Sequence, residues 1–155
     1  MIRAARPEDI PGIADIWNPI IRNTTVTFTA QIKSSQGLAE MIATRPVFVV
    51  GQDRVEGFAT YGPFRGGDGY RHTAEHTIHL SPDARGRGQG RALMTHLMEH
   101  ARAAGIHTLW AGCSAENTGG IAFHERLGFT RTADLPQVGR KFDRWIDLIL
   151  LHRML

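Results

Sequence analysis

The chain has 155 residues, of which 42% are hydrophobic and 21% are charged, and a formal net charge of +3 at pH 7. This length suits one domain over residues 1–155, and the composition argues against a disordered chain. The longest apolar stretch, "WIDLILL", is far shorter than the roughly 20 residues that a membrane helix needs. Because the chain has one cysteine, Cys113, and no apolar signal-peptide core, we expect a cytoplasmic protein without internal disulfides.

The N-terminal third predicts one strand and two helices. Residues 2–5 are typical of a short strand, and apolar residues then recur at helical spacing over residues 10–17. Residues 23–30, "NTTVTFTA", are β-branched but polar, so we expect a loop or a short extended piece. A second helix is predicted over residues 34–44, just before Pro46.

The middle of the chain predicts a hairpin, a loop and an alternating strand. Two apolar runs flank a polar turn over residues 47–61, and a glycine-rich loop follows to residue 72. Residues 74–80, "AEHTIHL", alternate in polarity as a strand does. One face of this strand would carry Ala74, His76, Ile78 and Leu80, and the other Glu75, Thr77 and His79.

The second half predicts strands separated by helices. Leu93, Met94, Leu97 and Met98 form the apolar stripe of a helix that ends before Gly105. We expect strands at 107–113, 129–133 and 144–155, and a short helix that is capped by Asn117 or Thr118 and ends at Gly128. This order predicts an α/β (α+β) fold whose central crossovers are parallel and right-handed.

The loop "RGRGQGR", residues 85–91, runs directly into a predicted helix. The free N–H groups and partial positive charge of a helix start, together with glycines and arginines, favour a phosphate site. A Walker loop is excluded because Gly90-Arg91-Ala92 lacks the required Gly-Lys-Ser/Thr ending. The glycine spacing and the mid-chain position also differ from the dinucleotide-binding fingerprint.

The remaining pattern is Arg-x-x-Gly-x-Gly, which Arg85, Gly88 and Gly90 satisfy. Together with "IRAARPEDIPGIADI" and "AENTGGIAFHERLGF", it resembles the GNAT superfamily of N-acetyltransferases over nearly the whole chain. The resemblance implies one domain, with a mixed central β-sheet flanked by helices and parallel around the acetyl-CoA crossover. It implies acetyl-CoA contacts by Ile78, His79, Leu80, Arg85, Gly86, Arg87, Gly88, Gln89, Gly90 and Asn117.

Three longer segments are similar to one branch of that superfamily: "GYRHTAEHTIHLSPDARGRGQGRAL", "LGF" and "LPQVGRKFDRWIDL". This branch acetylates the α-amino group of phosphinothricin, methionine sulfoximine or methionine sulfone. The resemblance therefore implies a small amino-acid substrate and a homodimer. The segment "TTVTFT", residues 24–29, is closer to phosphinothricin enzymes than to sulfone enzymes and leaves the identity of the amino acid open.

Acetyl transfer to an amine needs a base, because amino-acid amines are mostly protonated at neutral pH. Glu75 is the expected general base, from its strand position and from its match to the catalytic glutamate of the branch. Backbone N–H groups near Ile78 to Leu80 would hold the oxyanion, as in the superfamily. His124 stands where many relatives place a tyrosine acid, so the resemblance implies an acid or a positioning role.

Substrate contacts are expected in the loop before the alternating strand, which offers cations and N–H donors for a carboxylate. For Arg71 and His72, simple solvation of the loop remains the alternative. The expected contacts are Phe28, Arg65, Asp68, Gly69, Tyr70, Arg71 and His72.

Other interpretations are weaker. A zinc site would need more than His72, His76 and His79, two of which lie on opposite strand faces, so no metal is expected. A nucleic-acid module could use the basic loop, but no aromatic residue interleaves it for base stacking. Acetylation of another small amine and a non-catalytic acetyl-CoA sensor both stay open.

Overall fold

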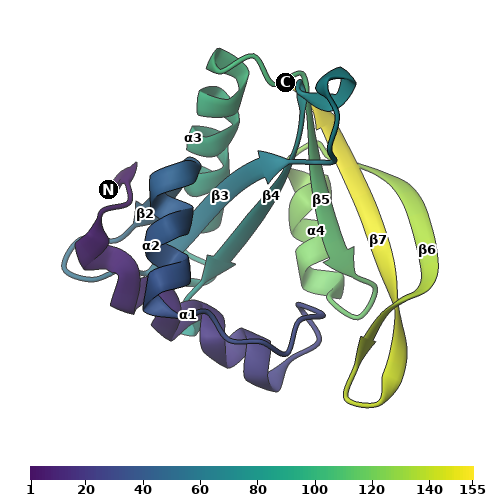
Figure 1. Ribbon diagram of the computed structural model, residues 1–155, viewed down its shortest axis with the longest axis horizontal. Coiled ribbons are helices and arrows are strands. Elements are labelled where there is room, and N and C mark those ends of the chain that lie inside the picture. The colour runs from purple at the N-terminus through teal and green to yellow at the C-terminus, as the bar shows by residue number, and fades with distance from the viewer.

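The computed structural model describes residues 1–155 as a seven-stranded sheet covered by helices on both faces (Figure 1). The predicted α/β class with a mixed sheet is confirmed. The helices are α1 (Ile10–Asn23), α2 (Ser35–Thr44), α3 (Gln89–Ala103) and α4 (Thr118–Arg126), with 3-10 turns η1 (Pro7–Asp9), η2 (Asp68–Tyr70) and η3 (Pro82–Ala84). The strands are β1 (Ile2–Ala4), β2 (Val47–Val50), β3 (Gly57–Pro63), β4 (Thr73–Leu80), β5 (Thr108–Ser114), β6 (Thr130–Lys141) and β7 (Arg144–Met154).

The strands lie in the order β1-β2-β3-β4-β5-β7-β6. Only β4 and β5 are parallel neighbours, and α3 joins them, as the crossover prediction required. The second predicted crossover is different: β7 inserts between β5 and β6, so the strands on either side of α4 do not pair. The long closing strand therefore completes the interior of the sheet.

The parallel pair β4 and β5 is hydrogen-bonded over only half its length. Its register runs from Thr73 opposite Thr108 to His76 opposite Ala111 and stops there. Beyond this point the two strands diverge, and Figure 1 shows them spreading apart as a V, with α4 behind the gap. The second half of β4 thus has a strand partner on its β3 side alone.

Two apolar cores lie on opposite faces of the sheet. The stripe of α3 packs on one face: Leu93, Met94 and Leu97 are buried, and Met98 is partly buried against the same cluster. Helices α1 and α2 cover the other face, where Ile13, Trp17, Leu38 and Phe58 belong to a separate cluster. The "VFVV" strand is buried on both faces, which explains its uninterrupted apolar run.

The hairpin of β6 and β7 is longer than the sequence predicted. The predicted strand at 129–133 continues to Lys141, through a Pro136 and a Gly139 that are unusual in strands. Register shifts between Arg131 and Ala133 and between Leu135 and Gly139 absorb these residues as bulges. Long-range pairing with β7 outweighs the local preference of the segment.

The helix α3 should anchor the fold through Leu97, which is 0% exposed. We expect Leu97→Ala to lower the free energy of unfolding by about 2–5 kcal/mol, because it removes buried methyl groups and leaves a cavity. Urea unfolding followed by circular dichroism measures this change. Thr95→Ala, at an exposed position of the same helix, is the control and should stay within about 0.5 kcal/mol of the parent. Equal losses in the two variants would contradict the assignment.

Candidate functional site

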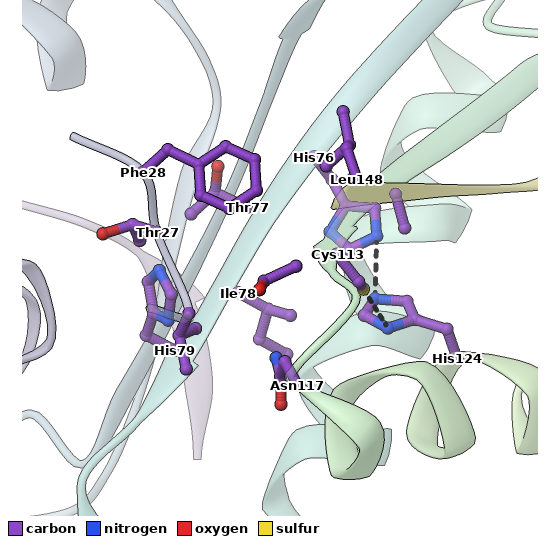
Figure 2. Close-up of a pocket in the computed structure, with 14 residues that line it drawn as sticks. Thr27, Phe28, His76, Thr77, Ile78, His79, Cys113, Asn117, His124 and Leu148 are labelled. Atoms are coloured by element: carbon purple, nitrogen blue, oxygen red, sulfur yellow. Dashed lines mark hydrogen bonds between the residues drawn. The ribbon is translucent and has the colours of Figure 1, made fainter. Parts of the chain in front are cut away.

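A cavity of about 190 Å³ opens where β4 and β5 diverge (Figure 2). Strand β4 contributes four consecutive residues because both of its faces border the opening. The walls come from β4, β5, β7, the loop after α1 and the start and inner face of α4. The lining residues are Val26, Thr27, Phe28, His76, Thr77, Ile78, His79, Ala111, Gly112, Cys113, Ser114, Asn117, His124 and Leu148.

The glycine loop forms a cradle of N–H groups at the start of α3. None of the six backbone N–H groups of residues 86–91 donates to a backbone carbonyl, and the first such bond is Ala92 N–H to Gly88 O. Gly86 and Gly88 have φ of +74° and +80°, which residues with a side chain rarely adopt. Unpaired N–H groups at a helix start have the chemistry that anions need.

Side chains around this loop hold its shape through one carboxylate. Glu56 accepts hydrogen bonds from Gln89 Nε2 at 2.6 Å and from Arg87 at 3.4 Å. The Gln89 bond is the largest cause that lowers the pKa of the Glu56 carboxyl. Arg85 and Arg91 are exposed and form no ion pair, so their charges remain available to a bound anion.

Asn117 caps α4, as predicted, and lines the cavity. Its Oδ1 accepts a hydrogen bond from Gly120 N at 3.0 Å. A Cβ on Gly120 would lie 2.3 Å from Asn117 Nδ2, so the glycine permits this close approach. The amide group of Asn117 is thereby held at the cavity wall.

Glu75 does not line the cavity; it lies on the exposed side of β4, over Gly112 of β5. A Cβ on Gly112 would be only 3.0 Å from Glu75 Oε1. The carboxylate has no hydrogen-bond or ion-pair partner, and desolvation raises its pKa above the ordinary value. A solvent-reachable carboxylate with a raised pKa is suited to accept a proton near neutral pH.

Aromatic rings border the same face beside Glu75. Trp110, which lies opposite Glu75 in the parallel register, stacks on Phe64 with ring centroids 5.2 Å apart. His152 of β7 stacks on the other side of Trp110 at 4.9 Å. The three stacked rings therefore lie beside the carboxylate.

His124 and His76 form a buried pair on the opposite face. Their Nε2 atoms are 3.2 Å apart (Figure 2). His124 Nδ1 is 2.7 Å from Gly120 O. Burial lowers the pKa of both rings, and that of His76 lies well below the ordinary value. The sulfur of Cys113 is 3.7 Å from His124 Nδ1, and burial raises the pKa of this thiol to about 11.

The expected substrate loop lies at the other end of β4. The loop enters the strand at Thr73, about 13 Å along the backbone from Thr77, and its six candidate residues do not line the cavity. Arg65 lies over the ring of Tyr70, with its guanidinium carbon 5.2 Å from the ring centroid. Arg71 Nε donates to His72 Nε2, while His72 Nδ1 lies 2.8 Å from Gly105 O. Asp68 and Gly69 form the exposed turn η2.

Phe28 does line the cavity, as part of a segment that covers it. Its ring packs on Gly139, where a Cβ would be 2.5 Å away. Lys141 is 5% exposed and donates from Nζ to Thr27 O at 2.8 Å. Thr25 donates to Glu116, which also pairs with Arg144. These contacts attach the loop after α1 to the β6–β7 hairpin.

Sequence reasoning missed several lining residues. The sequence suggests only a metal-ligand role for His76, although the apolar residues that share its strand face indicate burial. Gly112, Thr77 and Leu148 gave no local signal, because their roles depend on strands that are distant in sequence. No group of three or more His, Cys, Asp or Glu side chains could hold a metal ion, and no helix has the length and apolarity to cross a membrane.

Known proteins share this arrangement. A sequence model of the acetyltransferase (GNAT) family matches residues 21–129. The chain is 38% identical to the L-amino acid N-acyltransferase MnaT of Escherichia coli, covering 99% of this chain and 93% of the relative. It is 37% identical to the L-methionine sulfoximine/L-methionine sulfone acetyltransferase of Pseudomonas aeruginosa, covering 97% and 92% of the two chains.

A solved structure agrees with the fold. The GNAT superfamily phosphinothricin acetyltransferase of Sinorhizobium meliloti, in complex with AcCoA, superposes with a TM-score of 0.93 at 30% identity. The match covers 100% of this chain and 88% of that one. With the family model spanning most of its length, this chain belongs to the GNAT family and is an N-acetyltransferase.

Proposed function

We propose that this enzyme transfers the acetyl group of acetyl-CoA to the α-amino group of a small amino acid such as phosphinothricin, methionine sulfoximine or methionine sulfone. The observation that carries the proposal is the half of β4 that is unpaired on its β5 side; this half is preceded along the strand by the unpaired Glu75 carboxylate and followed by the cradle of free N–H groups. The named activities of the relatives support this substrate class. A thiol-release assay with these three amino acids and ordinary amino acids tests it.

The residues of the cradle fit the diphosphate of CoA. The N–H groups of residues 86–91 lack backbone partners, and Arg85 adds a free charge. The unpaired edge of β4 at Ile78, His79 and Leu80 would bind the pantetheine amides, and Asn117 would contact them from α4. When bound, acetyl-CoA supplies an activated thioester. Gly86, Arg87, Gly88, Gln89 and Gly90 complete this proposed binding segment.

Glu75 would accept the proton of the substrate ammonium group, because only the neutral amine attacks a thioester. Its raised pKa makes the carboxylate a stronger base than an ordinary glutamate. Backbone N–H groups of the free β4 edge would stabilise the oxyanion. The histidine pair containing His124 lies on the other side of β4, at the deep wall of the cavity.

The amino acid would lie between Glu75 and the loop that precedes β4. Phe28 would contact it from the cover of the cavity, and the Phe64–Trp110 stack would form an apolar floor. The exposed loop side chains would bind its carboxylate and its oxidised side-chain group, through charge and N–H donors. The proposed contacts in this loop are Arg65, Asp68, Gly69, Tyr70, Arg71 and His72.

We further propose a cytoplasmic homodimer that inactivates such amino acids. Three large apolar side chains, Val138, Phe142 and Trp145, are 55%, 54% and 57% exposed on the β6–β7 hairpin. Figure 1 shows this hairpin extending beyond the rest of the sheet. Exposed apolar clusters are typical of protein interfaces, which supports a second copy as the partner. The unpaired thiol of Cys113 is consistent with a reducing compartment.

Replacing the proposed base should lower the rate of acetyl transfer and remove the dependence of kcat/KM on pH. We expect Glu75→Gln to lower kcat by about 100-fold or more, because the amide cannot accept the amine proton. In the parent enzyme kcat/KM should increase as the pH rises through the raised pKa of Glu75, since the ionised carboxylate is the active form. At pH values below that pKa, kcat/KM should be low. Glu99→Gln, on the exposed side of α3, is the control. A pH profile unchanged by Glu75→Gln would contradict the role.

Gly112 should matter because it makes room for the Glu75 carboxylate. We expect Gly112→Ala to lower kcat by about tenfold, since its new Cβ displaces Oε1 from its position. Steady-state kinetics of Gly112→Ala, Glu75→Gln and the double variant measure this coupling. The double variant should be no slower than Glu75→Gln alone, and additive losses would show that Gly112 does not act through Glu75.

The cradle should depend on its left-handed glycines. We expect Gly88→Ala, at φ +80°, to strain the loop by about 1 kcal/mol and to weaken CoA binding by roughly tenfold. Isothermal titration calorimetry with CoA measures the affinity. Gly66→Ala is the matched control, because Gly66 has ordinary backbone angles and open space around it. Equal affinities for the two variants would argue against diphosphate binding at this loop.

A further inference from the structure

The hydrogen bonds of the buried histidine pair fix which nitrogen carries each proton. His124 Nδ1 lies 2.7 Å from Gly120 O, a carbonyl that can only accept, so Nδ1 donates. In a neutral ring the Nε2 of His124 is then an acceptor. Because it lies 3.2 Å from His76 Nε2, that atom of His76 must donate. Both nitrogens of His124 are therefore engaged.

The same reasoning leaves one free nitrogen, and it belongs to His76. Its Nδ1 carries a lone pair, is buried and has no hydrogen-bond partner. His76 lines the cavity, and Figure 2 shows its second ring nitrogen on the side away from His124. Buried acceptors are normally satisfied, so an unpaired one in a binding cavity indicates a donor on the ligand.

The surroundings of His76 contain no carboxylate that could pair with it. Tyr61 lies opposite it on β3, and its hydroxyl is 2.9 Å from His100 Nδ1. Cys113 of β5 is a protonated thiol, and His79 of the same strand is neutral because burial lowers its pKa to about 4. Burial, and after it the neighbouring His124 and His79, lower the pKa of His76 well below its ordinary value. A transient positive charge on His76 could be shared only with His124.

We propose that His76 is the ring that exchanges a proton with the reacting atoms, and that His124 is the positioning residue that holds it. This inference rests on the proposed acetyl transfer. The Nδ1 of His76 is the one unpaired nitrogen of the two rings and belongs to a cavity-lining residue, while its Nε2–H is fixed by His124 and, through it, by the carbonyl of Gly120. His76 would therefore have the acid role that the family resemblance implies for His124.

The protons balance as follows. Glu75 takes the first proton from the ammonium group and releases it to solvent. After the nitrogen–carbon bond forms, His76 Nδ1 accepts the second proton from that nitrogen. When the carbon–sulfur bond breaks and its electron pair stays on sulfur, His76 returns this proton to the thiolate. The low basicity of the buried ring favours the return step.

Imidazole NMR tests the assignment without turnover. In protein labelled with ¹⁵N-histidine, we expect His76 to be protonated at Nε2 and His124 at Nδ1. Adding CoA should shift the His76 Nδ1 resonance, whereas desulfo-CoA, which lacks the thiol, should not. The opposite tautomers, or a resonance that CoA leaves unchanged while CoA binds, would overturn the proposal. Absence of any CoA binding would instead contradict the proposed function.

Two glutamine variants separate the roles of the two rings. His76→Gln keeps an N–H donor near the former Nε2 but cannot exchange a proton, so kcat should fall by about 100-fold with CoA affinity unchanged. His124→Gln keeps an acceptor for His76 Nε2–H, and kcat should fall by less than about tenfold. A larger loss in His124→Gln than in His76→Gln would return the proton-exchange role to His124. Circular dichroism of each variant controls for folding.

Discussion

The site depends on one constraint: the hydrogen-bonded pairing of β4 with β5 ends halfway along β4. The parallel register stops at His76 opposite Ala111, although both strands continue. The backbone groups beyond that point face a gap in place of a neighbouring strand. Unpaired strand edges seek hydrogen-bond partners, so an extended ligand with amide groups can take the place of the missing strand. The cradle at the start of α3 lies where β4 leads into its loop, which sets the direction of such a ligand.

Strand β4 also divides the chemistry between its two faces. Glu75 points to the face with open solvent, and its pKa is raised only by partial desolvation. His76, the next residue, points to the helix-covered face and is buried as a neutral ring. Both residues lie at the last positions of β4 that pair with β5, directly before the gap opens. In the proposed reaction, these two adjacent residues would handle protons on opposite sides of one reacting group.

Local patterns predicted the parts of this site that are continuous in sequence. The alternation of "AEHTIHL" gave the correct faces, and the glycine-rich run gave the correct start of α3. The divergence of β4 and β5 could not be predicted from local patterns. It depends on the residue at which these two strands, which α3 connects, stop pairing. The insertion of β7 between β5 and β6, and the bulges that lengthen β6, also depend on pairing between distant segments.

Three glycines inside regular elements show what local patterns leave out. Gly112 in β5, Gly120 in α4 and Gly139 in β6 are not turn residues, and each lies against a side chain of the proposed site. A Cβ at these positions would lie 3.0 Å from Glu75, 2.3 Å from Asn117 and 2.5 Å from Phe28, respectively. Each glycine weakens its own element slightly. The shape of the site is therefore set partly by where side chains are missing, which only the assembled fold reveals.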